Sequence, residues 1–302
     1  MRKLTYAIAS IAFLLAGCSQ EESIMENKGE LVTLNYNISL KDGVQSRAGG
    51  ETTVEVNKLL CAIFENGTEL KREVVNVTNG TAEYKPALFK NIEYHIVFWA
   101  YYDNNGSICY DVSNLKNIKI NNNYDKDVFA NDAKKDAFTA VDVVTVTANP
   151  IQASVNLTRP FAQINVNTTE TDWNNAVALG GEPKYSKITV SGYANQYNAL
   201  NKEWSGTSGE DYTFTSTVSE NDNYSLASEY IFANGTAACT IQVFAEGDKE
   251  IFTKEITNFP IDANKRTNVT SQNDSGLMTG DVTYNITILP GLNETANNQE
   301  IN

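Results

Sequence analysis

Short runs in which apolar and polar residues alternate cover most of this chain, and glycine, asparagine and proline separate them. Residues 31–40 are the clearest example, because Leu34, Tyr36, Ile38 and Leu40 fall on one face and mostly polar residues fall on the other. A period of two is the pattern of a β-strand with one buried face. Regular short strands with almost no helical periodicity favour β-sandwiches. The sequence therefore predicts an all-β fold.

Further strands are predicted wherever this pattern returns. They are residues 54–64, 73–77, 81–84, 92–102, 107–112, 141–148, 151–157, 161–167, 186–193, 211–217, 229–233, 239–245, 251–256 and 282–289. Asn79-Gly80 and Gly247-Asp248 predict hairpin turns, because such residue pairs tolerate positive φ. Residues 172–179 predict a short helix, and residues 113–140 predict a long loop.

The length of the chain, 302 residues, is more than one sandwich-sized core needs and favours two domains. We expect a signal peptide at residues 1–17 and an acidic tether at residues 18–30. An N-terminal β-sandwich domain is predicted at residues 31–168, and a C-terminal β-sandwich domain at residues 169–302.

The N-terminus has the features of an export signal. Arg2 and Lys3 precede an apolar run at residues 6–15 that is too short to span a bilayer as a mature helix. Leu15-Ala16-Gly17-Cys18 follows and resembles a bacterial lipobox, in which Cys18 is acylated and becomes the first residue of the mature protein. Each buried methylene of the acyl chains contributes about 0.8 kcal/mol to membrane binding. The alternative is an ordinary secretory signal with a chance cysteine.

A short acidic segment containing Glu21 and Glu22 comes directly after Cys18. It is similar to the signal that sends lipoproteins of Bacteroidetes to the outer face of the outer membrane. We therefore expect a lipid-anchored, surface-exposed protein of the outer membrane.

The net charge argues against nucleic acid as a partner. It is −14 for the whole chain and becomes −16 without residues 1–17, which hold two basic and no acidic residues. Phosphate repels so acidic a surface, and no cluster of lysine and arginine interrupts it.

Three cysteines remain beyond Cys18, namely Cys61, Cys109 and Cys239. Each lies within or beside an apolar run, and an odd number cannot pair completely. Small buried hydrophobic residues are therefore favoured over a disulfide framework.

The sequence gives little support to catalysis. His95 is the only histidine, which excludes metal sites that need two, and its place inside a predicted strand favours a structural role. The motifs of α/β-hydrolases, P-loop NTPases and dinucleotide-binding folds are absent. Asp103-Asn104-Asn105-Gly106 lacks the ligand spacing of an EF-hand and predicts a turn. We therefore expect no enzymatic activity and no catalytic, cofactor-binding or metal-binding residue.

Four stretches together resemble the fimbrillin-like surface lipoproteins of Bacteroidales, the type V pilin superfamily. They are residues 95–100 (His-Ile-Val-Phe-Trp-Ala), residues 135–138 (Lys-Asp-Ala-Phe), residues 157–164 (Leu-Thr-Arg-Pro-Phe-Ala-Gln-Ile), and residues 264–269 (Asn-Lys-Arg-Thr-Asn-Val) with 281–286 (Asp-Val-Thr-Tyr-Asn-Ile). Their order behind a lipobox is similar to the family's order and spans nearly the whole chain.

The resemblance implies two transthyretin-like β-sandwich domains in tandem and a structural or adhesive role in pili. In pilins of this family the precursor is cut after an arginine in the loop that follows the first strand. Loss of that strand then opens a groove that a strand of another subunit fills. Arg47-Ala48 stands in the loop after residues 31–40, so Arg47 and Ala48 form the candidate processing site. The alternative is that Arg47 is an exposed arginine in a flexible loop.

The C-terminal tail departs from the pattern of stalk pilins, which carry a further apolar donor segment. Here Pro290-Gly291-Leu292-Asn293 and nine mostly polar residues end the chain. The resemblance then implies a tip or accessory subunit, with other pilin subunits as partners through strand addition.

A rival reading is a glycan- or ligand-binding surface lipoprotein outside any pilus. Trp173 and Trp204 occur in loop-like contexts and could stack on sugar rings if they are exposed. The alternative for both residues is that they cover edges of the sandwiches. The sequence names no adhesion target.

Overall fold

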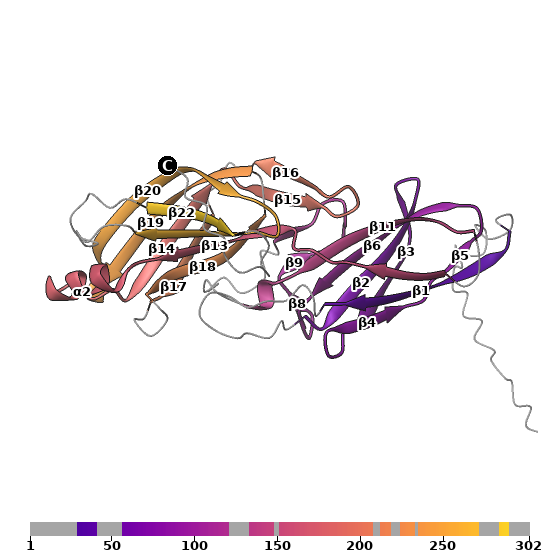
Figure 1. Cartoon of the computed structure of the whole chain (residues 1–302), viewed down its shortest axis with the longest axis horizontal. Coiled ribbons are helices and arrows are strands. Elements are labelled where there is room, and N and C mark those ends of the chain that lie inside the picture. The colour runs from indigo at the N-terminus through magenta and orange to yellow at the C-terminus, as the bar shows by residue number, and fades with distance from the viewer. Residues whose placement is uncertain are drawn as a thin grey trace, which may run out of the picture.

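The computed structural model describes residues 29–40, 56–120, 133–147, 151–207, 212–218, 224–232, 235–271 and 284–289. Nearly all of the regular structure in these ranges is strand, which confirms the predicted all-β fold. The molecule is elongated, and its N-terminal and C-terminal halves lie end to end (Figure 1). No helix in these ranges is long and apolar enough to cross a membrane.

The N-terminal half contains strands β1 to β12. They are β1 (Leu31–Ser39), β2 (Lys58–Glu65), β3 (Thr68–Asn76), β4 (Thr81–Tyr84), β5 (Ala87–Phe89), β6 (Glu93–Tyr101), β7 (Asp103–Asn104), β8 (Ser107–Ile108), β9 (Tyr110–Asp111), β10 (Lys119–Ile120), β11 (Phe138–Thr145) and β12 (Ile151–Val155). A 3₁₀ turn, η2 (Ala133–Lys135), precedes β11.

The C-terminal half contains strands β13 to β22. They are β13 (Phe161–Asn167), β14 (Tyr185–Ser191), β15 (Ala194–Asn198), β16 (Glu203–Thr207), β17 (Tyr212–Thr217), β18 (Ser225–Phe232), β19 (Gly235–Ala245), β20 (Lys249–Ile261), β21 (Arg266–Ser271) and β22 (Tyr284–Leu289). The helix α2 (Glu170–Ala178) follows β13, and the 3₁₀ turn η4 (Glu246–Asp248) joins β19 to β20.

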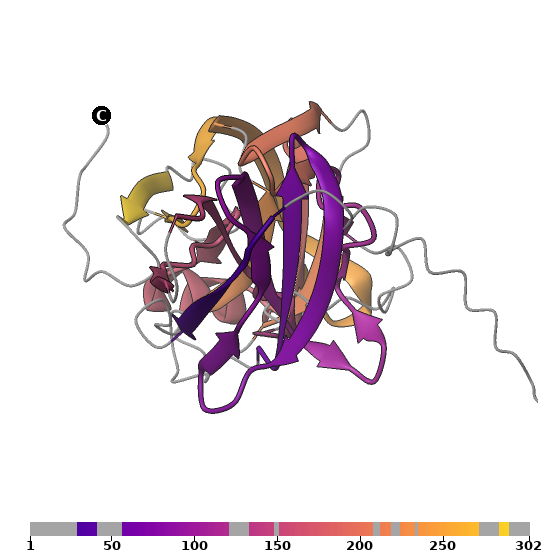
Figure 2. The same cartoon turned by 90° about the vertical axis from the view of Figure 1, so that its right-hand side faces the viewer.

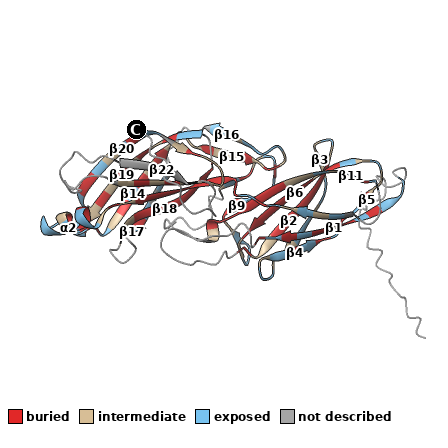
Figure 3. Ribbon diagram, in the orientation of Figure 1, coloured by how far each residue is buried: buried red, intermediate tan, exposed pale blue. Residues whose placement is uncertain are grey.

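Each half is a sandwich of two sheets. In the N-terminal half, β12-β1-β4 with β5 faces β11-β6-β2-β3, and one cluster of buried side chains fills the space between them. In the C-terminal half, β18-β13-β21-β22 faces β17-β14-β19-β20 around a second cluster. The strands β2, β6, β13 and β18 are buried along nearly their whole length, whereas exposed positions gather at turns and strand ends (Figure 3). The view from the end of the N-terminal half shows its strands crossing in layers (Figure 2).

The two halves repeat one topology. The first strand of each half, β1 or β13, pairs antiparallel with a strand from the middle of that half, β4 or β18. It also pairs in parallel with a late strand, β12 or β21. The second sheets correspond as β3-β2-β6-β11 and β17-β14-β19-β20. The strand β22 has no counterpart in the N-terminal half, because it adds to the outer edge of β21 after the repeat is complete.

A third cluster of buried side chains joins the halves. Trp99 of the N-terminal half lies 6.1 Å from Tyr197 of the C-terminal half, measured between ring centroids. Tyr110 stacks on Phe161 at 6.1 Å. The main chains of Ile118 and Tyr197 form an isolated β-bridge with hydrogen bonds of 2.8 and 2.9 Å. The halves therefore share an apolar core.

Two ion pairs are buried beside this shared core. Lys135 binds Glu229 of β18, and Arg159 binds Asp136 through two hydrogen bonds of 2.7 Å. The Arg159 guanidinium also lies over the ring of Phe138, 4.4 Å from its centroid. Buried charges of this kind need such partners, because an unpaired charge in an apolar interior is strongly destabilising.

Several local predictions are confirmed. The helix predicted at residues 172–179 is α2, whose N-terminus is capped by Thr169 through a 3.1 Å hydrogen bond from the amide of Asp172. The turn at Gly247-Asp248 joins β19 and β20 into an antiparallel hairpin. The turn after Asp103 joins β7 and β8, with the amide of Gly106 bound to the Asp103 carboxylate.

The turn at Asn79-Gly80 and the strands on either side of it are confirmed, but the prediction that these two strands pair with each other as a hairpin is wrong. Thr78 and Thr81 exchange two backbone hydrogen bonds of 2.9 and 3.0 Å around the turn. The strands then separate, because β3 pairs with β2 in one sheet and β4 pairs with β1 in the other. The turn is thus a corner between the two layers of the sandwich.

The predicted boundary after residue 168 assigns residues 161–167 to the N-terminal domain. In the structure these residues form β13, which pairs with β18 and β21 of the C-terminal half. A boundary before Phe161 would agree with these long-range pairings, which the sequence pattern did not indicate. The hairpin of β15 and β16 was also not predicted.

Candidate functional site

The strand β1 occupies the centre of its sheet. It pairs in parallel with β12 on one edge, from Leu34 opposite Ile151 to Ile38 opposite Val155. On its other edge it pairs antiparallel with β4 and β5. Both edges of its backbone are therefore hydrogen-bonded, so that losing β1 would leave two sets of unpaired N–H and C=O groups.

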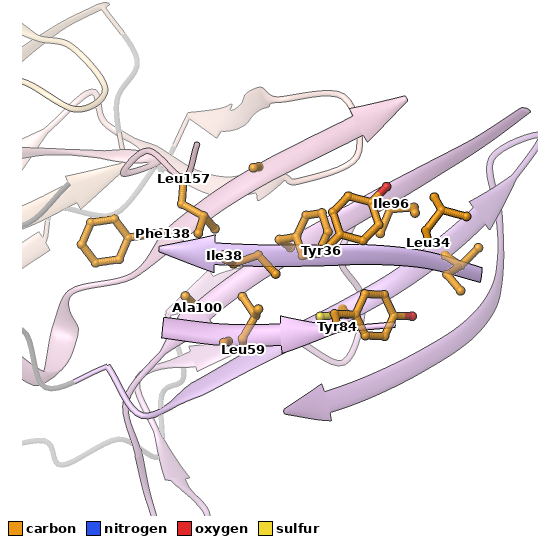
Figure 4. Close-up of a cluster of buried hydrophobic side chains, with 14 of the residues drawn as sticks. Leu34, Tyr36, Ile38, Leu59, Tyr84, Ile96, Ala100, Phe138 and Leu157 are labelled. Carbon is orange, nitrogen blue, oxygen red and sulfur yellow. The ribbon is translucent and has the colours of Figure 1, made fainter. Parts of the chain in front are cut away.

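One face of β1 is part of the core of the N-terminal sandwich. The inward side chains are all buried, at 4% exposure or less, and are Val32, Leu34, Tyr36, Ile38 and Leu40. Asn37 and Ser39 on the opposite face are exposed. This arrangement confirms the predicted alternation, and Figure 4 shows Leu34, Tyr36 and Ile38 pointing from β1 into the cluster.

Tyr36 contacts residues of both sheets of the N-terminal sandwich. Its ring lies 5.2 Å from that of Phe98 in an edge-on arrangement and 6.4 Å from that of Tyr84. Its hydroxyl donates a 2.7 Å hydrogen bond to Oδ2 of Asp142, on β11 in the facing sheet. Burial, followed by this hydrogen bond, raises the pKa of Tyr36 far above its ordinary value. The tyrosine therefore stays protonated and acts as a donor.

The predicted processing and lipidation residues lie outside the described residues. Arg47 and Ala48 belong to residues 41–55, which connect β1 to β2, and Cys18 precedes Gly29. Their roles stay predictions. Residues 41–55 follow directly after Leu40, at the end of the buried central strand β1.

His95 lies on β6, as predicted, and its side chain is 39% exposed. Its Nε2 atom is 3.7 Å from a carboxylate oxygen of Glu93, whose side chain is also exposed. The ring of His95 is therefore at the surface, although its neighbours in β6, Tyr94 and Ile96, are buried.

The two tryptophans considered for sugar binding are not exposed platforms. Trp173, on α2, is 3% exposed and packs against Tyr224 at 5.9 Å. Trp204, on β16, is half-buried; its indole N–H donates to the carbonyl of Pro160, and its ring lies 5.3 Å from Tyr197. The structure therefore contradicts the exposed-ring interpretation and agrees with the alternative that both residues cover the sandwiches.

The three cysteines of the described chain are buried in three different clusters. Cys61 belongs to the N-terminal core, Cys109 to the shared core and Cys239 to the C-terminal core. Burial raises the pKa of Cys239 to about 12. Burial, and then the charge of Glu73, raises the pKa of Cys61 well above the ordinary value. These positions agree with the prediction of small buried hydrophobic residues.

Other candidate sites are sparse in the described ranges. No group of three or more histidine, cysteine, aspartate or glutamate residues there could hold a metal ion. A depression of about 490 Å³ opens on the C-terminal half and is lined by Ser191, Gly192, Thr236, Ala237, Ala238, Thr257 and Asn258. None of these lining residues is aromatic, so the depression offers no ring for a sugar to stack on.

Solved structures with the same fold come from Bacteroides species. A crystal structure from Bacteroides eggerthii, described as a "putative cell adhesion protein", is 13% identical, covers 86% of this chain and 96% of its own, and has a TM-score of 0.55. A protein of the same description from Bacteroides uniformis is 10% identical, with 85% and 96% coverage and a TM-score of 0.52. Structures from Bacteroides thetaiotaomicron described as "putative polysaccharide binding proteins" are 11% identical, with 85% and 95% coverage and a TM-score of 0.50. No curated protein sequence matches the chain.

The chain thus shares its fold with these putative cell adhesion proteins of Bacteroides, which agrees with the fold that the resemblance implied. The chain belongs to DUF6562, a family of unknown function, whose profile matches residues 26–302.

Asp142 and the charged pairs of the shared core were missed by the sequence reasoning. Asp142 stands in a strand that reads as ordinary alternation, and its partner Tyr36 is 106 positions away. No spacing or pairing pattern in the sequence sets Lys135 and Asp136 apart from ordinary surface charges. The one available signal was charged residues directly before the apolar run at residues 137–141.

Proposed function

We propose that this protein is a surface adhesin or pilus subunit that is assembled by removal of β1 and its replacement by a strand of another subunit. The observation that carries the proposal is the position of β1. It is a central strand, buried along one face, and it ends directly before residues 41–55, which contain Arg47. A single cut in that loop would separate β1 from the rest of the sandwich.

The energetics favour replacement over simple loss. Four side chains of β1 and that of the next residue, Leu40, are buried, and burying each contributes about 1.5–3 kcal/mol. Loss of the strand would also leave β12, β4 and β5 with unpaired edges. A cut precursor should therefore retain β1 until an incoming strand satisfies the same groups by β-augmentation.

We propose further that acylated Cys18 tethers the uncut precursor to the outer membrane, and that the subunit acts at the tip or as an accessory component after the cut has separated it from Cys18. The support for the tether is the lipobox at residues 15–18. The glycan-binding alternative has less support, because Trp173 is buried and Trp204 is committed to contacts with Pro160 and Tyr197.

The test is the fate of Arg47→Ala protein in its native host. Sheared surface fibres should lack the variant, and its β1 should remain joined to the chain in mass spectra. Lys41→Ala is the matched control, because it removes the other basic residue of the same loop and should leave fibre incorporation unchanged. Incorporation of Arg47→Ala protein at the wild-type level would contradict the proposal.

A further inference from the structure

The strand β17 (Tyr212–Thr217) lies at an edge of the C-terminal sandwich (Figure 1). Among the strands that the structure describes, it pairs with β14 alone. Directly after it, the amide of Val218 donates a 3.1 Å hydrogen bond to the carbonyl of Lys184, the residue opposite it in the ladder. In an antiparallel ladder, residues that bond to the neighbouring strand alternate with residues that do not. Every second residue before Val218 therefore bonds to β14, and the residues between them direct their backbone N–H and C=O groups toward the open edge.

The residues that face the open edge are Thr213, Thr215 and Thr217. All three are exposed, and their side chains share the outer face of the sheet. The hydroxyl of Thr213 already lies 3.0 Å from that of Thr189 on β14, so threonines pair across strands on this face. The carbonyl of Thr217 accepts a 3.2 Å hydrogen bond from the Ser216 hydroxyl, and a carbonyl oxygen can accept a second bond. The edge thus presents regularly spaced donors and acceptors beside exposed hydroxyl groups.

This edge is complementary to a second copy of itself. In an antiparallel pair, residues whose backbone groups point outward must meet residues of the same kind. If a two-fold axis passes through Thr215, that residue meets its own copy, and Thr213 of each chain meets Thr217 of the other. Every outward-pointing residue of β17 is then hydrogen-bonded, and the two sheets become one. The cross-strand threonine pairs that result each contribute about 0.2–1 kcal/mol.

The longer edge strands of the molecule differ from β17 because each directs a charged residue toward a core. These residues are Glu73 of β3, Asp142 of β11, Glu229 of β18 and Lys254 of β20, which stand opposite the buried residues Cys61, Ile96, Ile164 and Ile241. Inward-pointing charges and β-bulges discourage pairing between edges, and β20 also has two irregularities in its register. In contrast, β17 has no charged residue and no register shift. The strands β12 and β22 are uncharged as well, so a test has to tell β17 from them.

From these observations we propose that two copies of this chain associate side by side through antiparallel pairing of their β17 strands, with Thr215 on the two-fold axis. The contact uses the C-terminal sandwich and leaves β1 in place. It is therefore independent of the proposed replacement of β1 and adds a lateral contact to it. The ladder is short, so the dimer is of the weak, transient kind in solution.

Sedimentation velocity of full-length Arg47→Ala protein tests the inference, because β1 stays joined to this chain and its removal cannot contribute to association. The protein should pass from monomer to dimer between about 1 and 100 µM. Thr215→Lys and Thr215→Glu, each alone, should lower the association constant by at least roughly 10-fold, because like charges then meet across the axis. An equimolar mixture of the two variants should restore association as a heterodimer, which native mass spectrometry identifies. Thr253→Lys is the matched control, since Thr253 is an exposed threonine on the outer face of β20, and it should leave association unchanged.

The remaining outcomes count against the inference. A protein that stays monomeric over the whole range would overturn it. So would a dimer that survives both substitutions, because it would use another edge, such as that of β12 or β22. If the mixed variants do not associate, Thr215 does not meet its own copy and the two-fold register is wrong.

A cysteine variant gives a second measurement that adds no charge to the edge. Residues directly opposite each other in a hydrogen-bonded pair have Cα atoms about 5.5 Å apart, a separation that a disulfide can bridge. Thr215→Cys protein should therefore form a disulfide-linked dimer under mild oxidation, whereas Thr253→Cys protein should not. Equal cross-linking of both variants would overturn the inference. Incorporation of Arg47→Ala protein into fibres would instead contradict the proposed removal of β1 and would leave the pairing of β17 unaffected.

Discussion

The ammonium group of Lys135 binds the carboxylate of Glu229 at a place where their side chains are only 4% and 0% exposed. Lys135 precedes β11 in the N-terminal half, and Glu229 lies on β18 in the C-terminal half, 94 positions further along the chain. The pair therefore spans the contact between the halves, beside the shared aromatic core. This contact makes the relative position of the halves part of the folded structure.

Lys135→Met should destabilise the protein by about 3–5 kcal/mol, because the buried carboxylate of Glu229 would lose its ion pair with Lys135. The double variant Lys135→Met/Glu229→Leu should recover most of this loss, since neither charge then remains. Urea unfolding monitored by tryptophan fluorescence measures both. Equal stability of the single variant and the wild type would show that the pair does not hold the halves together.

Cys18→Ala should abolish acylation and release the protein from the membrane fraction, because acyl chains supply the proposed anchor. Metabolic labelling with a palmitate analogue, with fractionation of the cells, measures this. Ser19→Ala is the control and should remain labelled. Equal labelling of Cys18→Ala protein would remove the lipobox interpretation.

His95→Gln should change the free energy of unfolding by less than about 0.5 kcal/mol, because the ring is at the surface and its neighbour Glu93 is exposed. Incorporation into fibres should also be unchanged. Thermal unfolding and the fibre assay check the two parts. Loss of function in a variant that is as stable as wild type would assign His95 a role beyond structure.

Cys61 and Cys239 should resist alkylation by iodoacetamide at pH 8 in the folded protein and react fully in guanidinium chloride. Both are buried, and the raised pKa of each thiol keeps it protonated. Peptide mapping by mass spectrometry reads out each residue. Rapid labelling without denaturant would show that these parts of the cores open readily.

The raised pKa of the Cys239 thiol predicts how the stability of the protein changes at alkaline pH. An unfolded cysteine has a pKa of about 8.5, whereas burial raises that of Cys239 to about 12. The stability that protonated Cys239 contributes should therefore be complete below pH 8.5 and decline as the pH rises toward 12. A Cys239→Ala variant should lose less stability than the wild type over this interval, as measured by urea unfolding. An identical decline in both proteins would assign the effect to other groups.

The sequence by itself determined most of the strands and the buried face of β1. Leu34, Tyr36 and Ile38 point inward because alternation with a period of two is a local property of the extended chain, visible in any short window. The type of turn at Asn79-Gly80 was equally local, because it depends on residues that tolerate positive φ.

Only the tertiary structure decided which strands meet. The strands beside Asn79-Gly80 lie in different sheets, and β13 pairs with strands of the C-terminal half. The side chains of Tyr36 and Asp142 meet across the N-terminal sandwich. These relationships join residues far apart in the sequence, and an alternating strand can pair with many others that present an apolar face. The choice among them depends on packing of the whole core and on satisfying buried polar groups, which no short stretch of sequence contains.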